Sequence, residues 1–203
     1  MKIIFAFIGR IVGLMITNQF LERLNFARTF FYTGLLSRSF KLFGHDSSID
    51  RPIQLVNPQC ISIGNNTHIL KGSRLTALNN NSYINIGSNI NLGYSCHIMC
   101  LDTITIGNGC LFGANVLVSD NSHGQFVEEQ LVCQPSKRPL FSKGKVRIED
   151  NVWVGENVSI LSGVTIGKGS IIGANSVVTH DIPPFSLAVG TPAKVIKTIS
   201  VNQ

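Results

Sequence analysis

His123 is the residue of this chain best suited to acid–base chemistry near neutral pH. It lies in the segment DNSHG at residues 120–124, directly before a stretch, 124–145, that has no internal repeat. An imidazole with its ordinary pKa of about 6.5 can take a proton from a reacting group. A rigid wall can hold a histidine at the base of a loop while the ring faces a cleft. The position suggests a general base, although a lone histidine is more often structural or simply exposed.

A catalytic imidazole needs an acceptor that orients its second nitrogen. Asp102 and Asp120 are the candidates for this role, and His97 is a further one. Cys133 lies in the loop but has no obvious activating partner in the sequence. A covalent mechanism through this thiol is therefore not favoured.

The cysteines and histidines indicate neither a disulfide framework nor a metal site. The five cysteines are an odd number and include no CxxC pair. Buried free thiols in a reducing compartment, the cytosol, are therefore expected. The histidines lack the close pair that a metal site on one turn needs: they are His45, His68, His97, His123 and His180.

The sequence contains a six-residue period, which indicates the element that must position these residues. Aliphatic side chains recur at Ile148, Val154, Ile160, Ile166, Ile172 and Val178. Neither an amphipathic helix nor a flat strand has this period. It is typical of a chain coiled into a triangular prism, with one hexapeptide per side and the aliphatic residue pointing inward. Glycines and asparagines between these positions, such as Gly155, Asn157, Gly173 and Asn175, suit corners with positive φ. We therefore predict a parallel β-helix.

Less regular hexapeptides begin near Ile49, and they divide the chain into three parts. Residues 1–48 form an apolar helical segment, residues 49–184 the β-helix, and residues 185–203 a short C-terminal tail. The β-helix is interrupted by an extruded loop at 124–145. A loop of this length inside a regular solenoid is more often functional than accidental.

The N-terminal segment is rich in Ile, Phe and Leu. Arg10 interrupts its first apolar stretch, which falls short of the ~20 residues of a transmembrane helix. No small-residue cleavage site follows cleanly, which argues against a signal peptide. Apolar residues from Phe20 to Phe31 recur at three- and four-residue spacing, as in an amphipathic helix. Two roles stay open for residues 1–44: a cap on the first coil or a neighbouring subunit, and a basic helix on a membrane surface.

The chain is basic, with 17 Lys and Arg against 11 Asp and Glu and a formal charge of +6. Its surface should attract anions in general. Compact Lys/Arg runs and an interleaved aromatic platform are missing from the sequence, so nucleic acid is not an expected partner.

Four sequence features together resemble the hexapeptide-repeat acyltransferases. They are the Ile/Val-Gly-x-x-x-x hexapeptides, DNSHG before the loop, VRIEDNVWVGENVSILSGVTIGKGSIIGANSVVTHDIPP, and the closing AVGTPAKVIK. Within that superfamily the chain looks most like the sugar O-acetyltransferases of bacterial surface polysaccharides such as O-antigen and capsule. The resemblance implies a left-handed β-helix, a homotrimer, acetyl-CoA as donor and an active site shared between adjacent subunits. It also implies that His123 removes the acceptor proton and that the acetyl group is transferred directly.

The same resemblance implies a set of acetyl-CoA contacts. They are Trp153, Gly155 and Glu156 near the pantetheine arm, Ala174 and Thr179 along its course, and Lys194 and Lys197 at the nucleotide phosphates. The lysines also have a physical case, because a bisphosphorylated adenosine needs cations. His180 stands where many relatives have a lysine at a phosphate contact. Trp153 has an alternative role as a corner aromatic that packs on the next coil.

One part of the family pattern is missing. The related galactoside acetyltransferases place an Asn and an Asp in the coil before the histidine, at positions that fall on Gly93 and Leu101 here. Asp102 is adjacent but not matched. The residue that orients His123 therefore stays open.

The favoured function is an acetyl-CoA-dependent O-acetyltransferase acting on a sugar hydroxyl of a surface polysaccharide or its lipid-linked precursor. The alternatives are an N-acetyltransferase on an amino-sugar nucleotide, a small-molecule drug acetyltransferase, and a non-catalytic β-helix scaffold. We expect a cytoplasmic protein, peripheral on the inner face of the cytoplasmic membrane if the N-terminal segment binds there.

Overall fold

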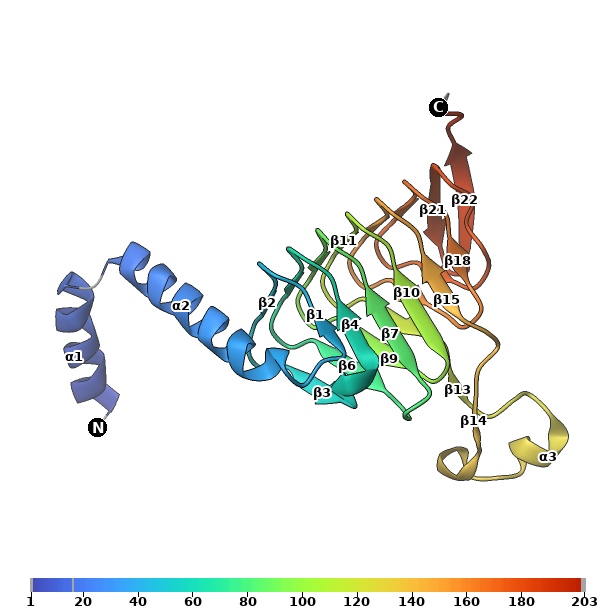
Figure 1. Ribbon diagram of the computed structural model, residues 1–203, viewed down its shortest axis with the longest axis horizontal. Coiled ribbons are helices and arrows are strands. Elements are labelled where there is room, and N and C mark those ends of the chain that lie inside the picture. The colour runs from blue at the N-terminus through green and yellow to red at the C-terminus, as the bar shows by residue number, and fades with distance from the viewer. Residues whose placement is uncertain (1, 16, 202–203) are drawn as a thin grey trace.

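A computed structural model describes residues 2–15 and 17–201, in which three parallel sheets form the sides of a prism (Figure 1). Sheet A has the order β1 (Leu42–Phe43), β4 (Ile61–Ile63), β7 (Tyr83–Ile86), β10 (Thr103–Ile106), β15 (Val146–Ile148) and β18 (Thr165–Ile166). Sheet B has the order β2 (Ser48–Ile49), β5 (His68–Ile69), β8 (Asn91–Leu92), β11 (Leu111–Phe112), β16 (Trp153–Val154), β19 (Ile171–Ile172), β21 (Ser186–Gly190) and β22 (Ala193–Thr198). Sheet C has the order β20 (Val177–Val178), β17 (Ser159–Ile160), β12 (Leu117–Ser119), β9 (His97–Cys100), β6 (Arg74–Ala77) and β3 (Gln54–Val56).

The six-residue period places one aliphatic side chain per side inside the prism. The residues of the period pair between adjacent coils, one pair in each sheet: Ile148 with Ile166, Val154 with Ile172, and Ile160 with Val178. All six are fully buried. Because each coil stacks the same residue type on the next, the interior is one continuous aliphatic column. The parallel β-helix predicted from the sequence is confirmed.

The corners combine two kinds of residue for different physical reasons. Asn157 and Asn175 adopt positive φ, 57° and 61°, and the side-chain amide of Asn157 donates to the Asn175 oxygen at 3.2 Å. Gly155 and Gly173 do not have positive φ, so the prediction for these glycines is wrong. A Cβ at Gly155 would lie 2.6 Å from the backbone nitrogen of Ala174. The glycine is needed because successive coils pass too closely for a side chain.

Paired strands extend past both predicted limits of the β-helix. Strand β1 pairs with β4 before residue 49, and β21 pairs with β19 after residue 184. The predicted tail is a hairpin, because β22 turns back antiparallel to β21. It stands at the C-terminal end of the prism (Figure 1).

The extruded loop leaves the prism between sheets C and A and projects away from it (Figure 1). Its neck is the antiparallel pair β13 (Ser122–His123) and β14 (Leu140–Phe141). The outer part contains the short helix α3 (Glu128–Leu131) and the 3-10 turn η2 (Pro135–Lys137). Another 3-10 turn, η1 (Pro58–Cys60), precedes β4 in the prism.

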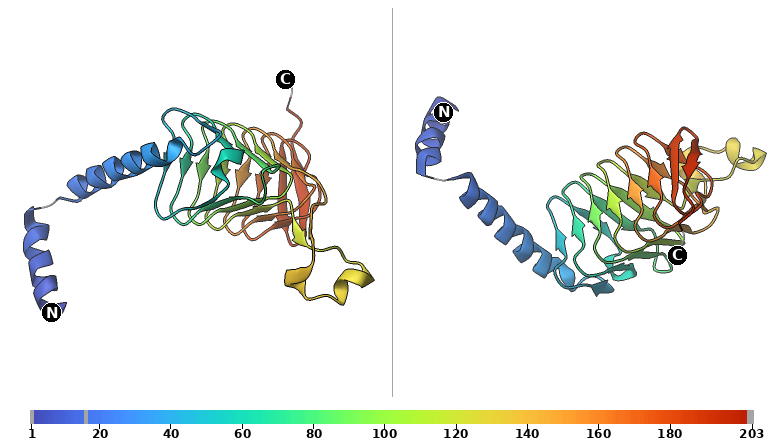
Figure 2. Two further views of the ribbon diagram at one scale, coloured as in Figure 1. Left: turned by 60° about the horizontal axis from the view of Figure 1, so that its bottom comes forward. Right: turned by 90° about the horizontal axis from the view of Figure 1, so that it is seen from above.

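Two helices precede the prism, α1 (Lys2–Met15) and α2 (Asn18–Ser37). Only the last turns of α2 touch the first coil, while its first turns and α1 project away from the prism (Figures 1 and 2). The Ile49 backbone N–H donates to Thr33 Oγ1 at 2.9 Å, and the Thr29 hydroxyl donates to Asp50 Oδ1 at 2.9 Å. Neither of these helices, as far as residues 2–15 and 17–201 show, combines the length and apolar character needed to cross a membrane.

Candidate functional site

His123 is held by backbone pairing at the neck of the loop. It lies opposite Leu140 in the β13–β14 pair, and its side chain is exposed. The next residue, Gly124, has a φ of +86°, which turns the chain sharply after the histidine. A Cβ at Gly124 would lie 2.6 Å from Gln130 Oε1, so the turn also packs against the outer loop. Within the part of the chain that the structure describes, the imidazole forms no hydrogen bond. The ring is therefore fixed at its base and open to a substrate.

Asp120 does not orient the imidazole in this structure, contrary to one of the sequence predictions. Its carboxylate is buried and accepts hydrogen bonds from the backbone N–H of Leu101 at 2.6 Å and of Asp102 at 2.8 Å. The thiol of Cys100 also donates to it, at 3.4 Å. Burial, followed by the charge of Asp120, raises the pKa of the Cys100 thiol. Asp120 thus ties the start of the loop to the preceding coil.

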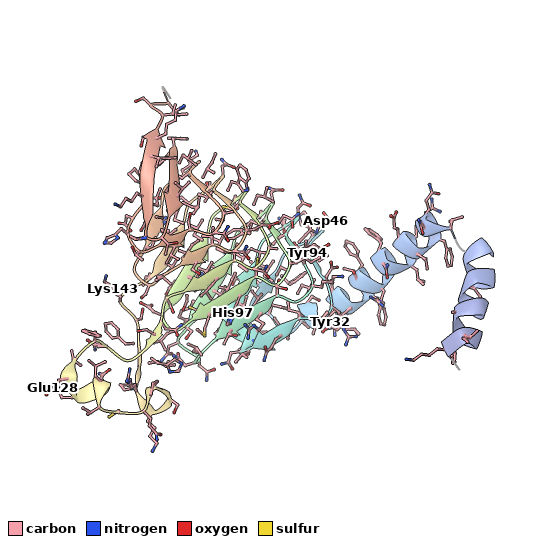
Figure 3. All side chains as sticks on the ribbon, turned by 180° about the vertical axis from the view of Figure 1, so that it is seen from behind. Tyr32, Asp46, Tyr94, His97, Glu128 and Lys143 are labelled. Carbon is pink, nitrogen blue, oxygen red and sulfur yellow. The ribbon has the colours of Figure 1, made fainter. Side chains whose placement is uncertain are left out.

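The other two candidate partners also lie on that coil. Asp102 is half-buried, and its Oδ1 accepts a hydrogen bond from the Thr103 hydroxyl at 3.0 Å. His97 lies in β9 on the wall of the prism (Figure 3), and burial together with the charge of Arg74 lowers its pKa. Neither residue forms a hydrogen bond with His123 in the described chain. In the single subunit, then, these predicted partners are not assembled around the imidazole.

Ser162 clamps the neck of the loop, and sequence reasoning missed it. Its hydroxyl donates to the Asp120 carbonyl oxygen at 2.8 Å and accepts from the Lys143 backbone N–H at 2.7 Å. The outgoing and returning strands of the loop are thereby joined to one side chain of the next coil. In the sequence Ser162 is only a small residue of the repeat, so no local signal marks it.

A groove of about 740 Å³ opens at the neck of the loop, and His123 itself is not among the residues that line it. The residues next to the histidine, Ser122 and Gly124, line it, together with Phe126 and Phe141 from the two arms of the loop. The prism contributes residues from the next two coils to its floor: Leu161, Ser162 and Thr179. Its walls are mainly apolar, and Lys143 supplies a cation at the neck (Figure 3). The groove can take an extended, partly apolar ligand with a negative charge.

The predicted acetyl-CoA contacts lie on two different edges of the prism. Gly155, Glu156 and Ala174 lie on the edge between sheets B and C, with Gly155 stacked against Ala174. Trp153 is 52% exposed in β16 on the neighbouring side, where it pairs with Ile171. An exposed indole of this kind has room for a ligand.

Thr179 and His180 follow β20 on the edge between sheets C and A, the edge that also carries His123. The Thr179 hydroxyl and His180 Nδ1 lie 2.8 Å apart, so His180 is engaged locally. Lys194 and Lys197 are exposed in β22 at the end of the prism. One subunit by itself does not bring Thr179 and His180 together with the B–C edge.

The chain resembles known transferases in sequence. Residues 145–180 match the family model described as bacterial transferase hexapeptide (six repeats). Over 149 residues the chain is 34% identical to the putative lipopolysaccharide biosynthesis O-acetyl transferase WbbJ of Escherichia coli (strain K12). That match covers 72% of this chain and 76% of WbbJ.

Solved structures show the same fold. A hexapeptide-repeat acetyltransferase from Vibrio cholerae O1 biovar eltor, complexed with acetyl-CoA, is 27% identical with a TM-score of 0.57, covering 83% of this chain and 76% of that one. AntD, an N-acyltransferase from Bacillus cereus in complex with dTDP and 3-hydroxybutyryl-CoA, has a TM-score of 0.70. It is 22% identical, and the match covers 83% of this chain and 88% of AntD. At this identity the likeness to AntD shows the fold alone.

Proposed function

This chain belongs to the hexapeptide-repeat sugar acetyltransferases, enzymes built on a left-handed β-helix, and we propose that it transfers acetyl from acetyl-CoA to a hydroxyl of a surface polysaccharide or its lipid-linked precursor. The observation that carries the proposal is the position of His123. His123 is anchored by the β13–β14 pair and open to solvent, and its chain neighbours Ser122 and Gly124 line a groove that contains a cation. The relation to WbbJ supports an oxygen acceptor on a saccharide.

The residues present fit acetyl-CoA as donor. Trp153 offers an exposed aromatic face, and Gly155, stacked against Ala174, lies on the adjoining edge of the prism. Lys194 and Lys197 supply exposed cations for phosphate groups. When bound, acetyl-CoA supplies an acetyl group activated as a thioester.

His123 acts in this proposal as the general base. A free nitrogen of the imidazole accepts the proton of the acceptor hydroxyl while that oxygen bonds to the acetyl carbon. The carbon–sulfur bond then breaks, and the proton held by the imidazole can pass to the departing thiolate. No acyl-enzyme is required, since the exposed thiol, Cys133, lies in the outer loop and not beside His123 in the β13–β14 pair.

The two-edge arrangement favours a site shared by two copies of the chain. His123, Thr179 and His180 lie on the C–A edge, whereas Gly155, Glu156 and Ala174 lie on the B–C edge. In a closed ring of subunits, one edge of each prism meets a different edge of its neighbour. We therefore propose a homotrimer in which one subunit provides the base and the adjacent one much of the donor site.

Replacing His123 by Ala tests the proposal. Acetyl transfer should fall about 10²- to 10⁴-fold, while CoA binding measured by calorimetry stays unchanged. His45→Ala is the matched control, because His45 is also exposed but lies near the start of the prism, away from the loop. Transfer within about tenfold of the native rate in the His123→Ala protein would refute the assignment of the base.

An amine acceptor is the second candidate, because the fold, which AntD shares and uses for N-acyl transfer, does not by itself distinguish a hydroxyl from an amine. Offering matched sugars that carry a hydroxyl or an amino group at the same carbon discriminates the two functions. Preferential acetylation of the amine would replace the O-acetyl proposal while leaving the role of His123 intact. As part of the proposal we place the enzyme on the cytoplasmic side of the membrane, where its lipid-linked acceptor would be reached.

A further inference from the structure

Helix α2 has two faces with different surroundings. The face turned to the prism carries Thr29 and Thr33, which bond to Asp50 and to the Ile49 backbone, and Tyr32, whose ring lies 4.3 Å from the Arg51 guanidinium carbon. These contacts use polar and aromatic side chains at helical spacing. They fix the rotation of the helix about its own axis.

The opposite face of α2 is an exposed apolar stripe. It is formed by residues at spacings of four and three, which lie on one side of a helix: Phe20, Leu24, Ala27, Phe31 and Leu35. Phe31 is 71% exposed, Leu35 65% and Leu24 56%. Large side chains exposed in a row of this length mark a surface that meets an apolar partner. Most of α2 projects beyond the prism (Figures 1 and 2), and the large side chains of the stripe are exposed from Phe20 to Leu35.

The charges beside the stripe indicate what that partner is. By helical spacing, Arg23 borders it on one side and Arg28 on the other, and both are exposed. Arg38 follows directly after Ser37, the last residue of α2. Glu22 lies on the half of the helix turned away from the stripe. An apolar strip bordered by arginines is complementary to a bilayer with anionic head groups.

Helix α1 continues the apolar character with exposed Ile3, Phe5 and Val12. Such residues can meet lipid by lying on its surface. The prism and the stripe are on opposite sides of α2, so a bilayer against the stripe leaves the prism in water.

From these observations we propose that the stripe Phe20–Leu35 of α2 binds the surface of an anionic membrane. The inference goes beyond the proposed function, because it concerns only where the enzyme is held and not which sugar it modifies. It also assigns separate roles to the two faces of one helix: Thr29 and Thr33 attach the prism, and Leu24 and Phe31 enter the lipid.

Sedimentation of the full chain with vesicles tests this proposal. We expect binding to phosphatidylcholine vesicles that contain about a third phosphatidylglycerol, and much weaker binding to phosphatidylcholine alone. Raising the salt to about 0.5 M should weaken binding, because the charges on Arg23 and Arg28 are then screened. Equal binding to both vesicle types, or none to either, would overturn the proposal.

Two phenylalanines of α2 provide a matched pair of variants. Phe31→Ser, combined with Leu24→Ser, should lower vesicle binding at least about tenfold. Phe26→Ser should leave it unchanged, since Phe26 is 66% exposed but lies on the other face, with its ring 4.6 Å from that of Phe30. Equal losses in both proteins would mean that the stripe has no special role.

Two further measurements establish whether the Leu24→Ser/Phe31→Ser protein, the stripe variant, has lost membrane binding and nothing else. Calorimetry with CoA should give the same affinity in the stripe variant and the native chain, which separates loss of membrane binding from loss of the folded enzyme. Measuring the mass of the protein in solution tests whether a second copy of the chain, and not a membrane, covers the stripe. If the Leu24→Ser/Phe31→Ser protein dissociates into smaller oligomers while retaining vesicle binding, the stripe is a subunit interface and the membrane proposal fails.

Discussion

Asp120 and Asp102, the two carboxylates that the sequence offers as partners of His123, are joined to each other: Asp120 Oδ2 accepts a hydrogen bond from the Asp102 backbone N–H at 2.8 Å. The second oxygen of Asp120 accepts from the Leu101 backbone at 2.6 Å. A buried carboxylate that satisfies two backbone donors stabilises the corner where the loop begins. In the described chain it forms no hydrogen bond with the His123 imidazole.

Asp120→Ala should therefore lower stability strongly. Two half-buried N–H groups lose their acceptor, which costs about 2 kcal/mol in the free energy of unfolding. Asp102→Ala is the control and should cost less than about 1 kcal/mol, because the Asp102 side chain is half-buried and bonds only to the neighbouring Thr103. Thermal unfolding followed by circular dichroism measures both. Similar unfolding temperatures for the two variants would contradict the structural role assigned to Asp120.

Complementation between inactive chains should reveal the shared site. His123→Ala removes the base from the C–A edge, and Trp153→Ala with Ala174→Glu damages the donor surface around the B–C edge. Each protein alone should be inactive. In trimers assembled at random from equal amounts of both, about a quarter of the sites pair an intact base with an intact donor surface, so about a quarter of the native activity should return.

The mixing experiment has an internal control. Mixing the His123→Ala protein with itself through the same assembly steps must give no activity. A mixture of the two different variants that stays inactive, although mixed trimers are detected by mass, would show that base and donor surface belong to one chain.

The buried thiols predict a loss of stability in alkaline solution. Burial raises the pKa of Cys96 and of Cys110 from the usual 9.0 to about 11. The folded state therefore holds these protons more tightly than the unfolded state. The contribution of the protonated thiols to the free energy of unfolding should be fully present below pH 9. It should fall between about pH 9 and pH 11, by at most about 1.4 kcal/mol per pH unit for each thiol.

Thermal unfolding across this pH range measures the effect. Replacing Cys96 and Cys110 together by Ala should make the profile above pH 9 less steep, and the remaining slope comes from Cys100, whose pKa is also raised. The variant is less stable at neutral pH, because each lost sulfur leaves a small cavity. An unchanged slope in the double variant would mean that other groups cause the alkaline loss.

The amino-acid sequence by itself determined the prism and its interruption. The period of six from Ile148 to Val178 has one simple solution, because each aliphatic residue must face the interior of a three-sided coil. His123 was also marked by the sequence as the candidate base, since it stands where the period breaks. The helical character of residues 18–37 followed from their three- and four-residue spacing.

Only the tertiary structure decided which groups meet. The hydrogen-bond donors to Asp120 are Leu101 and Asp102, because parallel coils place residues about one turn apart side by side. A local sequence pattern does not indicate such a contact. Ser162 looks like any small residue of the repeat, yet stacking sets it against both strands of the loop neck. The sequence likewise left open whether the apolar residues of α2 face the prism or point away from it. They form a free stripe because Thr33 bonds to Ile49 and so fixes the rotation of the helix.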